Sequence, residues 1–270
     1  MKYLVRGAFF LFLPWWWSNA HCLDAITIHK TNAMRDLLDV VHGGPGELVI
    51  FDIDYTLLIA CDERINEYEF GEGIKRSVAE GKPPDEAKSM QVDKWTGLNQ
   101  AAPVCLVDRD IPWVRAELIK KNIRLMALTS RTPIPLLVEV TFRQLHDLGL
   151  EFPQTDPSWS KQYRFEDSIA ENFRAENSMA NVIYAQGVLF SDGSDKGNAL
   201  AAFFEKTGYV PKHLIFIDDS LKNVLALARL AEQLGIQYDG FHFTRAQELI
   251  DHEGFAALRA RAAPIGCGGG

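Results

Sequence analysis

The sequence predicts an α/β fold with a central parallel sheet, and three observations carry that prediction. First, a continuous apolar run over residues 48–51 and mainly apolar runs over residues 123–129 and 213–217 are typical of strands buried on both faces of a parallel sheet. Second, segments with helical periodicity separate these runs. Third, residues 62–108 are polar and too long for an ordinary connection, which indicates an inserted, mainly helical subdomain after the first strand.

The amino terminus has the layout of a secretory signal peptide. Two cations lead into an apolar block, which ends in Ser18-Asn19-Ala20, so we expect cleavage after Ala20. The block is too short to span a bilayer comfortably. We therefore expect residues 1–20 to be removed, no stable membrane span in the mature chain, and a periplasmic or secreted protein. An uncleaved anchor or interfacial segment is the alternative.

Charge and cysteine content narrow the class of protein further. Removing residues 1–20 takes away two cations and no acids, so the formal net charge falls from −8 to −10. Such a surface disfavours nucleic acid polymers, whose binding depends on clustered Lys and Arg. In an exported chain the four cysteines can form disulfides. We favour the pairs Cys61–Cys105 and Cys22–Cys267, and free thiols are the alternative.

The first predicted elements lead the chain to a buried strand and into the insert. A helix capped by Thr31 ends near residues 43–44, and the strand follows over residues 47–51. The insert is expected to be helical, with a break at residues 81–84. Its aromatic side chains are expected to form the core of the insert or, alternatively, to face a substrate: Tyr68, Phe70 and Trp95.

After residue 108 the two kinds of element alternate. We expect helices that begin near residues 111, 133, 196 and 221, strands over residues 123–131, 213–217 and 238–243, a short hairpin around Gly187, and a terminal helix. Gly208 and Gly235 are expected to end the third and fourth helices. Residues 151–179 have no regular pattern, and residues 266–270 are expected to form a flexible tail.

Chemically useful groups follow three of the predicted strands. These groups are Asp52 and Asp54, Thr129 to Arg131, and Asp218 and Asp219, and Lys196 joins them from the start of a helix. The carboxyl ends of strands are where open α/β sheets place their ligand sites. Ionised carboxylates are costly to bury alone, so we expect a divalent cation among them.

This pattern resembles the haloacid dehalogenase-like (HAD) superfamily. Its four motifs appear here as Asp52-Ile53-Asp54-Tyr55-Thr56, Thr129 or Ser130, Lys196, and Asp218-Asp219. The resemblance covers about residues 30–245 and is nearest to a group of exported bacterial proteins. It implies a Rossmann-like, three-layer core formed by residues 21–58 and 109–265, with residues 59–108 as an inserted cap after the first strand.

The motifs predict a phosphoryl-transfer site. Asp52 is the expected nucleophile, and Asp54, two residues away on an extended segment, is the expected general acid and base. Mg²⁺ is the expected cofactor because it favours oxygen ligands. The ligands expected from the chemistry and implied by the resemblance are the side chain of Asp52, the main-chain carbonyl of Asp54, and Asp218 or Asp219. Asp219 alternatively caps the following helix.

The phosphate-binding groups are expected to be hydroxyls and cations. Thr129, or less readily Ser130, would donate a hydrogen bond to a phosphoryl oxygen, and Lys196 would stabilise charge on it. Arg131 could add a bidentate contact. In the structural alternatives, Thr129 and Ser130 cap a helix, Arg131 forms a surface ion pair and Lys196 is solvated. No histidine is assigned to catalysis.

We therefore expect an exported, Mg²⁺-dependent phosphatase that acts on a small phosphomonoester through an aspartyl-phosphate. One alternative is a phosphomutase or nucleotidase of the same fold. The other is a metal-binding, catalytically inactive interaction protein.

Overall fold

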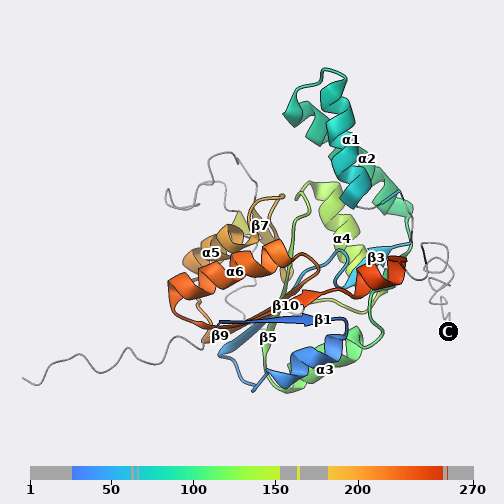
Figure 1. Ribbon diagram of the computed structural model, residues 1–270. Coiled ribbons are helices and arrows are strands. Elements are labelled where there is room, and N and C mark those ends of the chain that lie inside the picture. The colour runs from blue at the N-terminus through green and yellow to red at the C-terminus, as the bar shows by residue number, and fades with distance from the viewer. Residues whose placement is uncertain are drawn as a thin grey trace, which may run out of the picture.

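In the part of the chain that the structure describes, a central sheet of eight strands organises the fold. The computed structural model describes residues 26–251, apart from 62–63, 66, 153–162 and 165–181, together with residue 254. In spatial order the strands are β1 (Ile26–Thr31), β10 (Gln237–Phe243), β9 (His213–Asp218), β2 (Glu47–Phe51), β5 (Arg124–Thr129), β8 (Val188–Phe190), β7 (Ile183–Ala185) and β6 (Tyr163–Arg164). The first six pair in parallel and the last two antiparallel, which confirms the predicted α/β class (Figure 1).

Helices cover both faces of the sheet. They are η1 (Met34–Asp39), α3 (Ile111–Lys120), α4 (Pro135–Asp147), α5 (Lys196–Thr207) and α6 (Leu221–Leu234). Along β2, Leu48 and Ile50 belong to the apolar cluster that contains α5 and α6, whereas Val49 and Phe51 belong to the cluster that contains α3. Successive side chains of a strand point to opposite faces, so β2 is buried between two helical layers.

Most predicted elements form where the sequence places them. The expected strands correspond to β2, β5, β9 and β10, the hairpin around Gly187 is β7–β8, and the four expected helices are α3 to α6. Gly208 and Gly235 end α5 and α6 in the left-handed conformation, with φ of 66° and 64°, which a glycine adopts without a Cβ penalty. Residues 245–251 are helical, as expected of the terminal helix.

The segment before β2 differs from the prediction. The expected helix after Thr31 is a short 3₁₀ helix, η1, and the edge strand β1 precedes it, so β2 is the second strand in the chain. Most β1 side chains are exposed, so no buried apolar run marks this strand; its parallel hydrogen bonds to β10 define it. The predicted signal peptide, Cys22, Cys267 and the carboxyl-terminal tail lie outside the described residues.

Two helices occupy most of the predicted insert. Between β2 and α3 the chain forms β3 (Leu58–Ala60), α1 (Glu67–Ala79), α2 (Pro84–Ala101) and β4 (Val104–Leu106), so the expected break at residues 81–84 is confirmed. We call α1 and α2 the helical hairpin; it projects away from the sheet, and α2 contacts α4 at its base (Figure 1). No helix among the described residues is long and apolar enough to cross a membrane.

A disulfide closes the base of the helical hairpin. Cys61 and Cys105 are bonded, with Cα atoms 6.6 Å apart, beside the antiparallel pair β3–β4. This is one of the two pairs favoured from the sequence. The bond closes a loop across a sequence separation of 44 residues, which restricts the unfolded chain.

We predict that Cys61→Ser/Cys105→Ser lowers the free energy of unfolding by about 2–4 kcal/mol, because the unfolded chain regains the freedom of this loop. Urea unfolding with and without dithiothreitol measures the effect. Reduced wild type should match the double variant. Equal stability of oxidised and reduced wild type would contradict the prediction.

Candidate active site

Three adjacent strands bring the predicted site residues together. β2 lies between β9 and β5, and all three run in parallel, so their carboxyl ends meet at one edge of the sheet. Asp52 follows β2, Thr129 ends β5 and Asp218 ends β9. The parallel register therefore makes neighbours of residues that are far apart in the sequence.

Lys196 joins two of the carboxylates. Its side chain is 1% exposed, and its Nζ donates hydrogen bonds to Asp52 Oδ1 at 2.5 Å and to Asp218 Oδ2 at 2.7 Å. The alternative that Lys196 is solvated is therefore wrong. Lys196 begins α5, and the next residue, Gly197, lets α5 approach α6 closely: a Cβ there would lie 2.7 Å from the carbonyl oxygen of Ala226.

The charges in this cluster also shift the pKa values of Asp52 and Lys196. Burial raises the pKa of Asp52 to about 8, and the Asp218 carboxylate adds to this, although the Lys196 ammonium opposes it. Burial lowers the pKa of Lys196, but the two carboxylates outweigh it and raise that pKa above its usual range. One ammonium between two buried carboxylates stays charged, and a further cation beside Asp52 would favour its ionised form.

Asp218 and Asp219 take different positions. Asp218 is fully buried, and its carboxylate accepts hydrogen bonds from the Ser220 main-chain N–H at 2.8 Å and from Asn223 Nδ2 at 3.1 Å. Ser220 occupies the N-cap position of α6, so the alternative that Asp219 is the N-cap residue of this helix is wrong. The Asp219 main-chain N–H donates to Thr56 Oγ1, which in turn donates to Asp52 Oδ2.

The carboxylates fit a divalent cation. One oxygen from each of Asp52, Asp218 and Asp219 lies within 4.8 Å of the other two. An all-oxygen donor set suits a hard cation such as Mg²⁺. The geometry does not distinguish Mg²⁺ from another hard cation, but it places three of the four predicted ligand residues together.

Asp54 lies beside this group and is held by Arg131. Arg131 Nε and Nη2 donate to the two carboxylate oxygens of Asp54 at 2.8 and 2.7 Å. Arg131 is only 5% exposed, so the alternative of a surface ion pair is wrong. Its Nη1 donates to Thr141 Oγ1 and Gln144 Oε1, both at 2.8 Å, and these residues lie on α4.

The two predicted hydroxyls differ in exposure. Thr129 is buried and its Oγ1 accepts a hydrogen bond from the Arg131 main-chain N–H at 3.2 Å, whereas Ser130 is exposed. The residue at the cap position of α4 is Ile134, so the alternative that Thr129 and Ser130 cap that helix is wrong. Thr129 instead fixes the turn that aims Arg131 at Asp54.

A cavity of about 300 Å³ lies between this edge of the sheet and the helical hairpin. Asp54, Ser130 and Arg131 line its floor, and mainly apolar side chains line its walls. Phe70 and Trp95 face it from the hairpin and contact each other edge to face, with ring centroids 6.3 Å apart. The interpretation that these aromatics form only the core of the insert is therefore incomplete. The side chain of Tyr68 lies outside the described residues.

Several residues of the site were not identified from the sequence. Gln144 links Arg131 to the hairpin, because its Nε2 donates to Asn99 Oδ1 at 3.1 Å. Lys88 of the hairpin lies 3.7 Å from Asp192, and both line the cavity. One signal was present: Thr141 and Gln144 are three residues apart on a helix, so they place two polar groups on one side of α4.

Comparisons with known proteins identify relatives but no shared activity. A protein named "Putative outer membrane protein" from Chlamydia trachomatis is 22% identical over 85% of this chain and 79% of its own length. A similarly named protein from Chlamydia pneumoniae is 26% identical over 78% of this chain and 74% of its own length. No solved structure gives a significant match. A family described as "Protein of unknown function (DUF2608)" matches residues 30–257, and the chain belongs to that family.

Proposed function

We propose that the protein is an exported, Mg²⁺-dependent phosphatase that hydrolyses small phosphomonoesters through an aspartyl-phosphate on Asp52. The observation that carries this proposal is the buried Lys196 ammonium between Asp52 and Asp218, together with Asp54, two residues from Asp52, which lines a cavity of about 300 Å³. Buried charges of this kind are costly to maintain, and such clusters concentrate at functional sites. The resemblance of the four motifs to the HAD superfamily supports the same reaction.

The chemistry divides into two displacements. The Asp52 carboxylate attacks phosphorus, the bond to the leaving oxygen breaks, and Asp54 donates a proton to that oxygen. Asp54 then takes a proton from water, which attacks the aspartyl-phosphate, releases inorganic phosphate and restores Asp52. Lys196 stabilises negative charge on the phosphoryl oxygens, and Thr129 holds the turn beside them. Bound Mg²⁺, held by Asp52, Asp218 or Asp219 and the Asp54 carbonyl, would offset the repulsion between nucleophile and phosphate.

Arg131 has a different role from the one first expected. Its contacts with Asp54, Thr141 and Gln144 occupy four of the five N–H groups of a guanidinium. A bidentate contact with phosphate is therefore not available while Arg131 holds Asp54. We assign Arg131 as a positioning residue, which orients the Asp54 carboxylate toward the reacting oxygen.

The helical hairpin is proposed to act as a cap. It covers the cavity that Asp54 lines, so a leaving group attached to the phosphoryl oxygen would lie against Phe70 and Trp95. A covered, mainly apolar cavity excludes bulk water and limits the size of the substrate. The site therefore favours a small phosphomonoester.

We also propose that the protein is exported. Residues 1–20 have the layout of a signal peptide. Related chlamydial proteins carry names that place them in the outer membrane, which supports a location in the cell envelope or beyond it.

We predict that Asp52→Asn lowers phosphate release from an aryl phosphate by about 10³-fold or more, because the amide is a poor nucleophile. Removal of Mg²⁺ with EDTA should have a similar effect. Asp93→Asn, at an exposed position on α2, is the matched control and should keep the wild-type rate. Full activity of Asp52→Asn, or no activity of the intact protein with Mg²⁺, would contradict the mechanism.

We predict that Arg131→Lys lowers kcat about 10- to 100-fold with KM changed less than about threefold, because lysine cannot hold both Asp54 oxygens. Steady-state kinetics measures this split, and thermal unfolding checks that the variant is folded. Arg109→Lys, at an exposed position between β4 and α3, is the control. A change in KM alone would indicate that Arg131 binds substrate instead.

We predict that Trp95→Ala lowers kcat/KM for an aryl phosphate about fivefold, because an aromatic contact worth about 1 kcal/mol is lost. Inhibition by inorganic phosphate should stay within about twofold of wild type, since phosphate does not reach the cavity walls. Trp113→Ala, 45% exposed in the wild type, serves as the control. Equal losses for the aryl phosphate and for inorganic phosphate would contradict the placement of the leaving group.

A further inference from the structure

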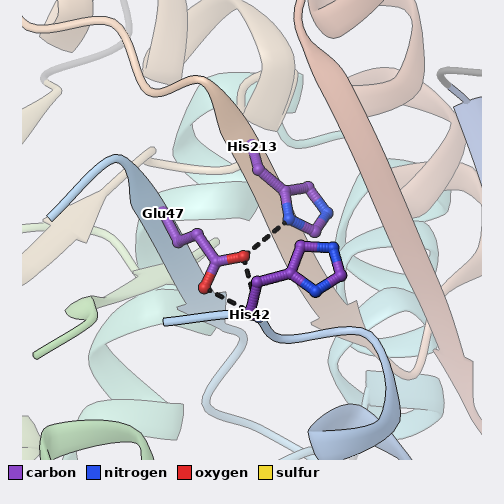
Figure 2. Close-up of side chains that lie close together, drawn as sticks. All are labelled: His42, Glu47 and His213. Atoms are coloured by element: carbon purple, nitrogen blue, oxygen red, sulfur yellow. Dashed lines mark hydrogen bonds and ion pairs between the residues drawn. The ribbon is translucent and has the colours of Figure 1, made fainter. Parts of the chain in front are cut away.

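We propose that His42, Glu47 and His213 form a second metal site, selective for Zn²⁺-like ions, at the edge of the sheet opposite Asp52 (Figure 2). Glu47 is the first residue of β2 and His213 the first of β9, and the two are paired in register. His42 precedes β2 in the connecting loop. Because Asp52 follows the other end of β2, this site is separate from the candidate active site.

The donor atoms suit a borderline divalent ion. One atom from each of the three side chains lies within 4.8 Å of the other two. The imidazoles of His42 and His213 face each other with ring centroids 5.9 Å apart, next to the Glu47 carboxylate (Figure 2). Two imidazoles and one carboxylate are a donor set that favours Zn²⁺ over Mg²⁺, and they leave a fourth position for water.

Asp239 fixes the tautomer of His213. His213 Nε2 lies 2.8 Å from Asp239 Oδ2, and a carboxylate accepts hydrogen bonds, so Nε2 carries a proton. Asp239 is held in turn by His29, whose Nε2 lies 2.8 Å from Asp239 Oδ1. Histidines that bind metal commonly donate their other N–H to a carboxylate in this way.

The remaining nitrogen of His213 needs a cation beside it. Nδ1 lies 3.0 Å from Glu47 Oε1, and two bare acceptor atoms at that distance repel each other. Either a proton or a metal ion must lie between them. Ligands at about 2.1 Å from a tetrahedral ion are about 3.4 Å apart, so a shift of about 0.4 Å opens the site. The Glu47 carboxylate is already oriented by the main-chain N–H groups of His42 and Gly43.

His42 is the residue through which the proposed metal site is open to solvent. It is exposed, and its ring forms no hydrogen bond with any residue that the structure describes, so its nitrogens are available as ligands. Glu47 and His213 are buried, 5% and 4% exposed. A bound ion would therefore join the exposed loop before β2 to two central strands of the sheet.

The rival occupant of this position is a proton. Burial lowers the pKa of His213, but its hydrogen bonds with Asp239 and Glu47 outweigh burial and raise the pKa above its ordinary value. An imidazolium would then bridge the two carboxylates without any metal. Measurement of the Zn²⁺ affinity distinguishes a bound metal ion from a proton at this position.

The test is Zn²⁺ titration of the tag-free protein by calorimetry, with excess Mg²⁺ present to occupy the acidic site around Asp52. We expect His42→Ala to weaken binding of one Zn²⁺ equivalent by about tenfold or more and to abolish a Zn²⁺-dependent rise in Tm. His146→Ala removes a matched exposed histidine that lies beside Glu151, and should bind Zn²⁺ as wild type does.

Two further results decide the proposal. Co²⁺ in place of Zn²⁺ should give visible absorption from a nitrogen-ligated, four-coordinate ion in the wild type and not in His42→Ala. The absence of Zn²⁺ binding, or equal binding by wild type and His42→Ala, would overturn the proposal and assign the position to a proton. His42→Ala should leave phosphate release unchanged, and Asp52→Asn should leave Zn²⁺ binding unchanged.

Discussion

The buried contact between Lys196 and the carboxylates of Asp52 and Asp218 is the interaction on which the site depends. Taking these charges out of water is costly, and loss of one partner would leave an uncompensated charge in the core. Two features of the fold bring these charges together. The adjacency of β2 and β9 places the two carboxylates side by side. The close approach of α5 to α6 at Gly197 places the lysine beside them. Stability alone does not explain a cluster of this kind, so we interpret it as a candidate active site.

A second set of contacts connects the site to the helical hairpin. Asp54 is held by Arg131, Arg131 by Gln144, and Gln144 by Asn99 of α2. The group proposed as acid and base is thus oriented by the same network that fastens the hairpin to the core, and the Cys61–Cys105 disulfide closes the hairpin at its base. A change in the position of the hairpin would therefore also change the orientation of Asp54. Under the proposed function, this link would connect substrate entry to catalysis.

Much of the fold could be predicted because its signals are local. Buried strands such as β2 and β9 appear as apolar runs, and Gly208 and Gly235 mark the ends of helices. The clustering of Asp52, Lys196 and Asp218 could be expected because parallel strands bring their carboxyl ends together. The partners of Arg131 could not, because they depend on how α4 and α2 pack. The edge strand β1 was missed for a related reason: its pairing with β10, rather than an apolar pattern, defines it.

The central claim is that Asp52 forms a covalent bond with the transferred phosphoryl group. The most direct measurement is to mix the protein briefly with an aryl phosphate and Mg²⁺, quench in acid, digest, and locate the phosphoryl group by mass spectrometry. The account predicts a phosphorylated peptide with the modification on Asp52 and none in the Asp52→Asn variant. Phosphate release without a phosphorylated Asp52, or with the phosphoryl group on another residue, would contradict it.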